Sequence, residues 1–190
     1  RQAYPCVAVQ SYPWNGQSPT LILLRNEIHD IQNDAIHATG GVAIIQGNHI
    51  HDIRYGAYAM EGIELSDIGI GAAAPAVIVE NHIRSVSDDC LDLNASSAVI
   101  ARNEFHTCGD KGISVGQAPA VVTITNNLID TCVGHVGDPL SGAGIAVKDG
   151  AVAHIVNNTV TGCERGVHLY EGHAGQGGGG AALVNTILWD

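Results

Sequence analysis

Five acidic residues in the middle of the chain have the types and spacing to carry chemistry. Glu61 and Glu64 are three residues apart, Asp89 and Asp92 repeat that spacing, and Asp88 lies beside Asp89. If the two segments lie side by side, Glu61 stands next to Asp89 and Glu64 next to Asp92, where like charges repel. Three compensations are open: a bound cation such as Ca²⁺, a raised pKa that turns one carboxyl into a proton donor, or solvation on an exposed surface.

These carboxyl groups suit two reactions on a polysaccharide. Hydrolysis with inversion needs one protonated carboxyl to donate to the leaving oxygen and one ionised carboxyl to activate water. Asp88 would be the acid, with Asp89 and Glu61 holding the water. Elimination would instead use a cation held by the four carboxylates of the two pairs, with Lys111 or Arg165 as base. For Lys111, a surface ion pair with a neighbouring Asp is the simpler interpretation.

A repeated phrase along the chain indicates the elements that position these residues. An apolar residue, two variable residues, Asn, one variable residue and an apolar residue recur as LLRNEI, IQGNHI, IVENHI, IARNEF, ITNNLI and IVNNTV, with a weaker copy in ALVNTIL. The Asn positions are 26, 48, 81, 103, 127, 158 and 185. A unit of about 22 residues, lengthened by loops, is being stacked. Asn suits a tight turn because it tolerates the left-handed conformation, and stacked amides bond one another.

A second phrase follows each Asn phrase and completes the unit. A small residue precedes alternating apolar and variable positions in AIHA at 35, GIEL at 62, CLDL at 90, GISV at 112, GIAV at 144 and GVHL at 166. Each unit thus carries three short segments with the period of two that is typical of half-buried strands. No stretch holds a helical pattern with caps. The chain is predicted to be an all-β parallel solenoid, with coils stacked at about 4.8 Å.

Aligning the six second segments predicts three rows of side chains on one face. The rows are His37, Glu64, Asp92, Ser114, Ala146 and His168; Asp34, Glu61, Asp89, Lys111, Ala143 and Arg165; and Thr39, Ser66, Asn94, Gly116, Lys148 and Tyr170. The first three units are acidic and the last three basic. Longer loops at 54–62, 66–76, 133–144 and 171–180 flank these segments, so we expect a groove. Strict alternation would point the row of Glu61 inward, so the turn before each strand must swing it outward.

The groove predicts two sets of residues beyond the proposed catalytic ones, Asp88, Asp89, Glu61 and Lys111. The substrate-binding set is His37, Glu64, Asp92, Lys148, Arg165 and Tyr170. The metal set, for Ca²⁺, is Glu61, Glu64, Asp89 and Asp92. No organic cofactor is expected.

The cysteines follow the same register. Five positions after each Asn lie Ile31, Ile53, Val86, Cys108, Cys132 and Cys163, which predicts one inward ladder of small core side chains. Thiols in an apolar interior are not activated, so a redox or metal role is not expected of them. Cys90, at the mouth of a strand, lies within reach of Cys108 in the next coil.

Composition excludes several classes of function. Of 190 residues, 45% are apolar and 14% charged, so the chain can bury a core. A net charge of −11 leaves no cationic excess for nucleic acid or an anionic membrane. The longest apolar runs are too short for a membrane-spanning helix, so membrane insertion is not expected.

The repeat resembles the right-handed parallel β-helix proteins, the pectin lyase-like superfamily of pectate lyases, polygalacturonases and alginate epimerases. The resemblance covers residues 20 to 190 and implies a single-stranded right-handed parallel β-helix of about six to seven coils. It is weak for function, because this fold hosts lyases, hydrolases, epimerases, adhesins and inert spacers.

Four segments on the second strand resemble, in order, the signatures of polygalacturonase-type glycoside hydrolases: MEGIEL at 60, SDDCLDLN at 87, CGDKGISVGQ at 108 and GIAVKD at 144. The resemblance places Asp88 and Asp89 on the acid pair, Glu61 on the first Asp, Lys148 on the final Lys, and Cys90 with Cys108 where some members have a disulfide. Lys111 replaces the family's His and Ala146 its Arg. Losing that Arg removes a group that would bind a uronate carboxylate.

These observations favour a polysaccharide-binding β-helix of a secreted or cell-surface protein that hydrolyses its ligand or cleaves it by Ca²⁺-assisted elimination. The alternative is a non-catalytic structural or adhesive segment. We expect residues 1–20 to be a lead-in or cap and 21–190 to be the repeats, within a longer chain. An uncovered end strand invites end-to-end self-association.

Overall fold

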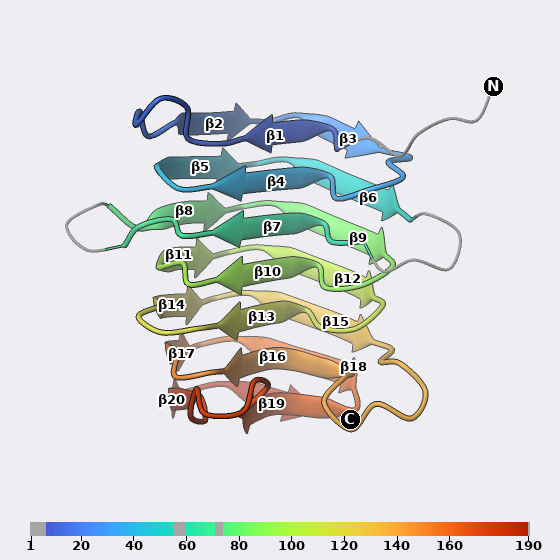
Figure 1. Ribbon diagram of the computed structural model, residues 1–190. Coiled ribbons are helices and arrows are strands. Elements are labelled where there is room, and N and C mark those ends of the chain that lie inside the picture. The colour runs from blue at the N-terminus through green and yellow to red at the C-terminus, as the bar shows by residue number, and fades with distance from the viewer. Residues whose placement is uncertain (1–6, 55–59, 71–73, 190) are drawn as a thin grey trace.

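The computed structural model describes residues 7–54, 60–70 and 74–189 of the chain (Figure 1). The described residues form 21 strands and no helix. The strands make three parallel sheets of seven strands, and each coil of chain gives one strand to each sheet. The molecule is therefore a parallel β-helix of seven coils, as the repeat predicts.

Along the chain, each coil passes through the first, the second and then the third sheet. The first sheet contains β1 (Val9–Ser11), β4 (Ile36–Thr39), β7 (Ile63–Ser66), β10 (Leu91–Asn94), β13 (Ile113–Gly116), β16 (Ala143–Lys148) and β19 (Arg165–Tyr170). The second sheet contains β2 (Thr20–Leu24), β5 (Val42–Gln46), β8 (Ala76–Val79), β11 (Ala98–Ala101), β14 (Val121–Thr125), β17 (Val152–Val156) and β20 (Gly180–Val184). The third sheet contains β3 (Glu27–His29), β6 (His49–Ile53), β9 (His82–Val86), β12 (Glu104–Cys108), β15 (Leu128–Cys132), β18 (Thr159–Cys163) and β21 (Ile187–Trp189).

The core is a column of aliphatic side chains inside the three sheets. Alternate residues of each strand point inward, so that Ile63, Leu91, Ile113 and Ile145 stack in one row and are fully buried. Phe105 is the largest fully buried side chain. Close stacking of residues of the same kind lets a chain poor in aromatics still exclude water from its interior.

An asparagine ladder runs inside the column beside the third sheet. The Nδ2 of each ladder Asn donates to the Oδ1 of the next at 2.9–3.0 Å, through Asn26, Asn48, Asn81, Asn103, Asn127 and Asn158. The same Oδ1 also accepts the backbone N–H of the preceding ladder Asn, as between Asn81 and Asn103 at 2.9 Å. The predicted ladder is confirmed, and it satisfies polar groups that burial would otherwise penalise.

Two expectations about the asparagines are wrong by one residue. The left-handed conformation is adopted by the residue before each ladder Asn, for example Arg25 (φ 57°), Gly47 (φ 66°) and Arg102 (φ 55°). In the last coil, Thr159 pairs with Ile187, so Thr186 and not Asn185 takes the ladder position. Asn185 takes the left-handed place instead, with φ 48°. The ladder Asn is therefore selected for its amide bonds and not for its backbone.

The cysteines occupy the inward ladder as predicted. Cys90 and Cys108 form a disulfide between adjacent coils. Cys132 and Cys163 are buried and unbridged, and their sulfur atoms share a hydrogen bond at 2.6 Å. Bonding to Cys163 and burial raise the pKa of Cys132 above its usual range, so this thiol stays protonated.

The two ends of the column differ from their neighbours. β1 lies within the stretch expected to be a lead-in, yet it pairs with β4, so the column begins before residue 20. In the last coil Leu169, Leu183 and Leu188 point along the core rows but remain 44–48% exposed. The apolar end of the column is thus open in the described part of the chain, and end-to-end association stays a prediction. None of the described residues forms a helix long and apolar enough to cross a membrane.

The ladder predicts a position-dependent loss of stability. Asn103→Ala should lower the free energy of unfolding by about 3 kcal/mol, because it removes the acceptor of the buried Asn81 backbone N–H, the bond between the two side-chain amides and the donor to the Ile78 carbonyl. Asn26→Ala, on the exposed first rung, should cost about 1 kcal/mol. Urea denaturation measures both, and equal losses would mean that the ladder is not a stabilising element.

Candidate functional site

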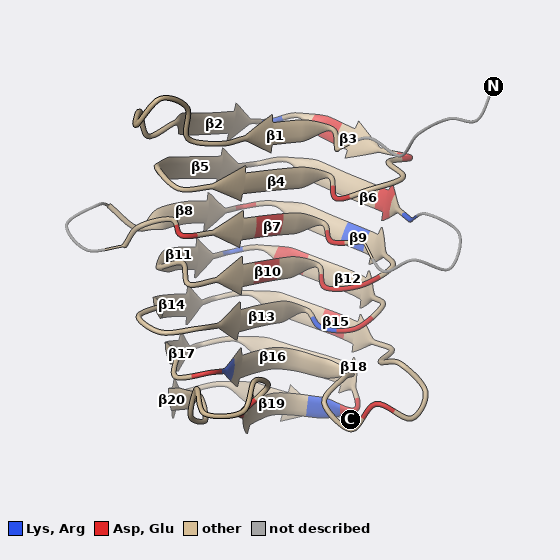
Figure 2. Ribbon diagram, viewed as in Figure 1, with Lys and Arg blue, Asp and Glu red and all other residues tan. Residues whose placement is uncertain are grey.

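The outward face of the first sheet carries the predicted rows. His37, Glu64, Asp92, Ser114, Ala146 and His168 pair in register from β4 to β19. Asn94 pairs with Gly116 and Lys148 with Tyr170 in the next row. Acidic residues lie on β7 and β10, and basic ones on β16 and β19 (Figure 2). Stacking thus divides the face into an acidic and a basic half.

The turns before the strands swing the remaining row outward. The Asp34 carboxylate accepts the backbone N–H of Glu61 at 3.2 Å, and the Asp89 carboxylate accepts that of Lys111 at 2.9 Å. Asp34 also contacts the outward side chain of His37, at 3.2 Å. Asp34 and Asp89 therefore bind the turn of the next coil from outside and lie on the same face as Glu64. The Glu61 carboxyl joins this face through its hydrogen bond with Asp34.

Glu61 has the most strongly raised pKa in the acidic half of the face. Burial, then its hydrogen bond with Asp34, raises the pKa of Glu61 to about 10. Burial also raises the pKa of Asp34, but bonds from Glu61 and His37 outweigh it and lower that pKa overall. Asp34 is the ionised partner and Glu61 the protonated one. Burial raises the pKa of Glu64 as well, although the His37 ring lies 2.7 Å from its carboxylate.

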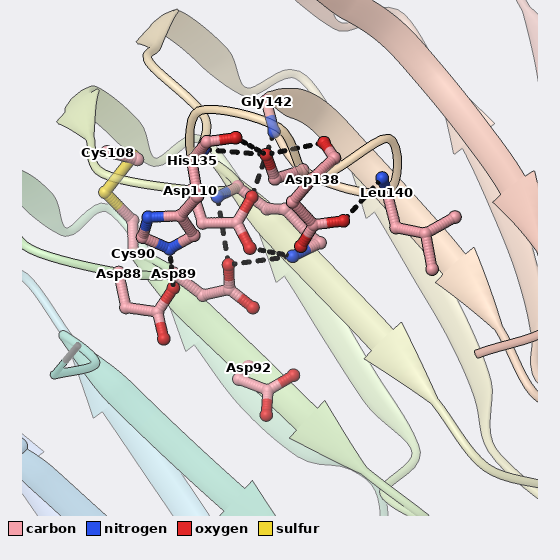
Figure 3. Close-up of polar contacts among 12 residues, drawn as sticks. Asp88, Asp89, Cys90, Asp92, Cys108, Asp110, His135, Asp138, Leu140 and Gly142 are labelled. Carbon is pink, nitrogen blue, oxygen red and sulfur yellow. Dashed lines mark hydrogen bonds and ion pairs between the residues drawn. A yellow bond between two sulfur atoms is a disulfide. The ribbon is translucent and has the colours of Figure 1, made fainter. Parts of the chain in front are cut away.

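The loop between β15 and β16 lies over Asp88. The His135 Nε2 lies 3.4 Å from Asp88 Oδ1, and Ser141 holds the His135 backbone N–H at 2.7 Å (Figure 3). Burial raises the pKa of Asp88, while the contact with His135 acts in the opposite direction. Asp88 is thus a partly buried carboxyl with a base at its edge, the arrangement of a proton donor. Sequence reasoning missed His135, because it lies in a loop outside the repeat.

A buried ion pair network holds Asp89. The Lys111 ammonium contacts Asp110 directly and lies 3.6 Å from Asp89 Oδ1, with both Lys111 and Asp89 side chains only 8% exposed. Burial lowers the pKa of Lys111, but Asp89 and Asp110 outweigh it and raise that pKa above its usual range. Burial raises the pKa of Asp89 to about 8, against the effect of Lys111. Lys111 therefore stays charged at neutral pH and has no free electron pair to act as the base of an elimination.

The basic half is held by contacts of its own. Arg165 donates to the Ser141 carbonyl at 2.6 Å. The rings of His168 and Tyr170 lie 4.6 Å apart, and burial raises the pKa of Tyr170 to about 12. Lys148 crosses Gly116, where an added Cβ would meet its Cε at 2.9 Å. A residue larger than Gly would displace this lysine from the face.

Three buried polar atoms on the central row have no hydrogen-bond partner among the described residues. They are Asp92 Oδ1, Ser114 Oγ and His168 Nδ1. Asp92 uses its other oxygen to accept the Asn94 amide at 2.7 Å. An unpaired buried polar atom costs free energy, and each of these three atoms is itself covered by the surrounding chain.

The residues expected to bind calcium are not brought together as a set. No three of Glu61, Glu64, Asp89 and Asp92, all of them described, offer oxygens within 4.8 Å of one another. Glu64 instead groups with Asp34 and His37, and Asp88 with Asp110 and His135. The Lys111 ammonium lies beside Asp89 and Asp110, and burial raises the pKa of Glu61, Glu64 and Asp89.

Comparison with known proteins agrees with this architecture. Residues 14–177 match the family described as "Right handed beta helix region". The chain belongs to the right-handed β-helix family. This β-helix also resembles the crystal structure of the periplasmic alginate epimerase AlgG, with a TM-score of 0.68 and 15% identity over 96% of this chain. It spans 43% of that protein. A search of curated protein sequences found no match.

The raised pKa of Glu61 predicts how the stability of the fold depends on pH. The folded pKa of Glu61 is about 10 against 4.5 for an ordinary Glu. Between these values the unfolded chain has lost the proton and the folded chain has kept it, so Glu61 makes stability fall as pH rises from about 4.5 to 10. Glu61→Gln should flatten this decline, as measured by thermal unfolding from pH 5 to 9. An identical decline in both proteins would contradict the assignment.

The buried network predicts a large cost for removing one cation. Lys111→Met leaves Asp89 and Asp110 buried without their counter-charge and should lower the free energy of unfolding by about 3–5 kcal/mol. Arg102→Met is the control, because its ion pair with Glu80 is exposed and worth about 0–1 kcal/mol. Urea denaturation of both variants at pH 7 compares them. A Lys111 loss no larger than that of Arg102 would place the lysine in solvent.

Proposed function

We propose that this β-helix binds a polysaccharide along the outward face of the first sheet and hydrolyses it. One observation carries the proposal: Glu61, Asp88 and Asp89 lie on one face in adjacent coils, and burial raises the pKa of all three. A carboxyl that keeps its proton at neutral pH is what glycoside hydrolysis requires of its acid. Perturbed acids gathered on a loop-flanked face are the mark of a functional site.

Asp88 is assigned as the general acid. It donates its proton to the glycosidic oxygen as the bond from that oxygen to the anomeric carbon breaks. Water adds to the anomeric carbon and passes a proton to the ionised form of Asp89, which the Lys111 ammonium stabilises and which becomes populated as the pH rises toward about 8; Asp89 then releases this proton to solvent. Glu61, protonated, orients the water by hydrogen bonding. His135 then returns a proton to Asp88 from solvent.

The binding groups favour a neutral polysaccharide. The partly exposed side chains of His168 and Tyr170 offer donors and acceptors to sugar hydroxyls. Tyr170 offers a ring against which a sugar can pack. His37, Glu64, Lys148 and Arg165 extend the surface on either side. Ala146 provides no cation for a uronate, and the acidic half repels polyanions. The similar structure is that of an alginate epimerase, and alginate is a polysaccharide, which supports this broad class of ligand.

A secreted or cell-surface location fits this function. The Cys90–Cys108 disulfide is typical of proteins in oxidising compartments. The alginate epimerase that this chain resembles is periplasmic. A polysaccharide of cell walls or capsules would meet the protein there.

The catalytic assignment predicts the effect of two amide substitutions. Asp88→Asn and Asp89→Asn should each lower the rate of reducing-end release by at least about 10²-fold, because an amide cannot transfer the proton. Glu80→Gln is the control, an exposed acid paired with Arg102 on another part of the surface. The measurement is a reducing-end assay on a panel of neutral and acidic polysaccharides.

Three results of this assay are informative. Loss in both Asp variants with full activity in Glu80→Gln supports the assignment. Unsaturated products would show elimination and contradict it. Binding of a polysaccharide with no product from the unmodified protein would leave the structural or adhesive function, with the polygalacturonase-like segments serving only packing.

A further inference from the structure

The outward face of the third sheet carries a histidine cluster that the proposed function does not use. Five rings from four coils contact one another in a chain, with centroids 4.4–5.3 Å apart: His29, His51, His49, His82 and His106. This face lies on a different side of the column from the first sheet (Figure 1). Two of these rings are largely covered, since the side chains of His51 and His106 are only 13% and 25% exposed.

The register brings one carboxylate between two of these rings. Glu104 lies on β12 directly beside His82 of β9 and two residues from His106 of its own strand. Glu104 Oε2 is 3.2 Å from His82 Nδ1 and 3.7 Å from His106 Nε2. One ligand atom from each residue lies within 4.8 Å of the others. Two imidazole nitrogens and one carboxylate oxygen thus converge on a single point.

A second carboxylate orients one of the rings. Asp130, on the next strand, pairs with His106, and its Oδ2 lies 3.4 Å from His106 Nδ1. A hydrogen on Nδ1 that donates to Asp130 leaves the Nε2 electron pair directed toward Glu104. A carboxylate on the far nitrogen of a histidine is how proteins orient and strengthen a metal-binding imidazole.

The neighbouring histidines form a poorer site. Glu27, His49 and His51 also converge. However, the Arg84 guanidinium donates to His49 Nε2 at 3.3 Å. That bond keeps the hydrogen of His49 on Nδ1, the nitrogen that faces Glu27. A metal at Nδ1 would have to displace this hydrogen.

We propose that His82, Glu104 and His106 form a binding site for a borderline divalent transition metal, zinc foremost, with Asp130 as the positioning residue. Two histidines and one glutamate are a known ligand set for zinc with an open fourth position. The half-exposed side chains of His82 and Glu104 leave that position open to solvent. Nitrogen ligands disfavour Ca²⁺ and Mg²⁺, which take oxygen.

The test uses untagged protein and zinc chloride in isothermal titration calorimetry at pH 7.5. One equivalent should bind to the unmodified protein. Glu104→Gln and His106→Ala should weaken binding at least about 100-fold, and Asp130→Asn about 10-fold, as loss of an orienting carboxylate does. His154→Ala, an exposed histidine of the second sheet, is the control and should bind as before. Substituted Co²⁺ should show the visible absorption of a tetrahedral site, which Glu104→Gln loses.

Two outcomes would overturn the proposal. The first is no zinc binding by the unmodified protein at micromolar concentrations. The second is zinc binding that survives both Glu104→Gln and His106→Ala but is lost in His49→Ala. That result would assign the metal to the neighbouring group of Glu27, His49 and His51. Thermal unfolding of each variant in chelator confirms that the fold is intact, so a lost site is not mistaken for a lost structure.

Discussion

Parallel stacking of the coils in exact register is the constraint on which the rest of this structure depends. Each residue of a strand lies beside the equivalent residue of the next coil, at about 4.8 Å. Inside the column the register makes an asparagine ladder and rows of aliphatic side chains, which close the core without a helix or a large aromatic cluster. Outside, it makes rows of polar side chains whose neighbours are fixed by position alone. Function in this fold is therefore decided by which residue types each row brings together.

The outward rows force electrostatic compensation, and the chain uses two forms of it. In the coils of β4, β7 and β10 acids stack on acids, and Glu61 keeps its proton while Asp34 is ionised. In the coil that follows Asp89, the residue at this position of the row is basic instead of acidic. This residue, Lys111, is buried between Asp89 and Asp110. The first arrangement stores a proton at neutral pH, and in the second the Lys111 charge opposes the effect of burial and so eases the ionisation of Asp89. Together they place a proton donor and an acceptor on one surface, which supports an acid-base function better than a cation site.

The repeat allowed the fold and the site rows to be predicted, because both depend only on counting from the asparagines. The pairing of Glu64 with Asp92 and the Cys90–Cys108 disulfide followed from the same counting and from family resemblance. His135 could not be predicted, since an irregular loop has no register to count. The pairing of Lys111 with a neighbouring Asp was predicted, but on the surface, whereas the pair is buried. The outward swing of Asp34 depends on a turn bond that alternation does not encode. The histidine face escaped notice because each ring alone has the pattern of a solvated residue.

Carboxyl ¹³C NMR titration of Glu61, Asp88 and Asp89 is the measurement that tests the central claim most directly. The claim is that burial on one face of the β-helix holds protons on acids at neutral pH. The account predicts an inflection near pH 10 for Glu61, one near pH 8 for Asp89, and one above the ordinary value for Asp88. Inflections of all three near pH 4 would show ionised, solvated carboxylates and would contradict it.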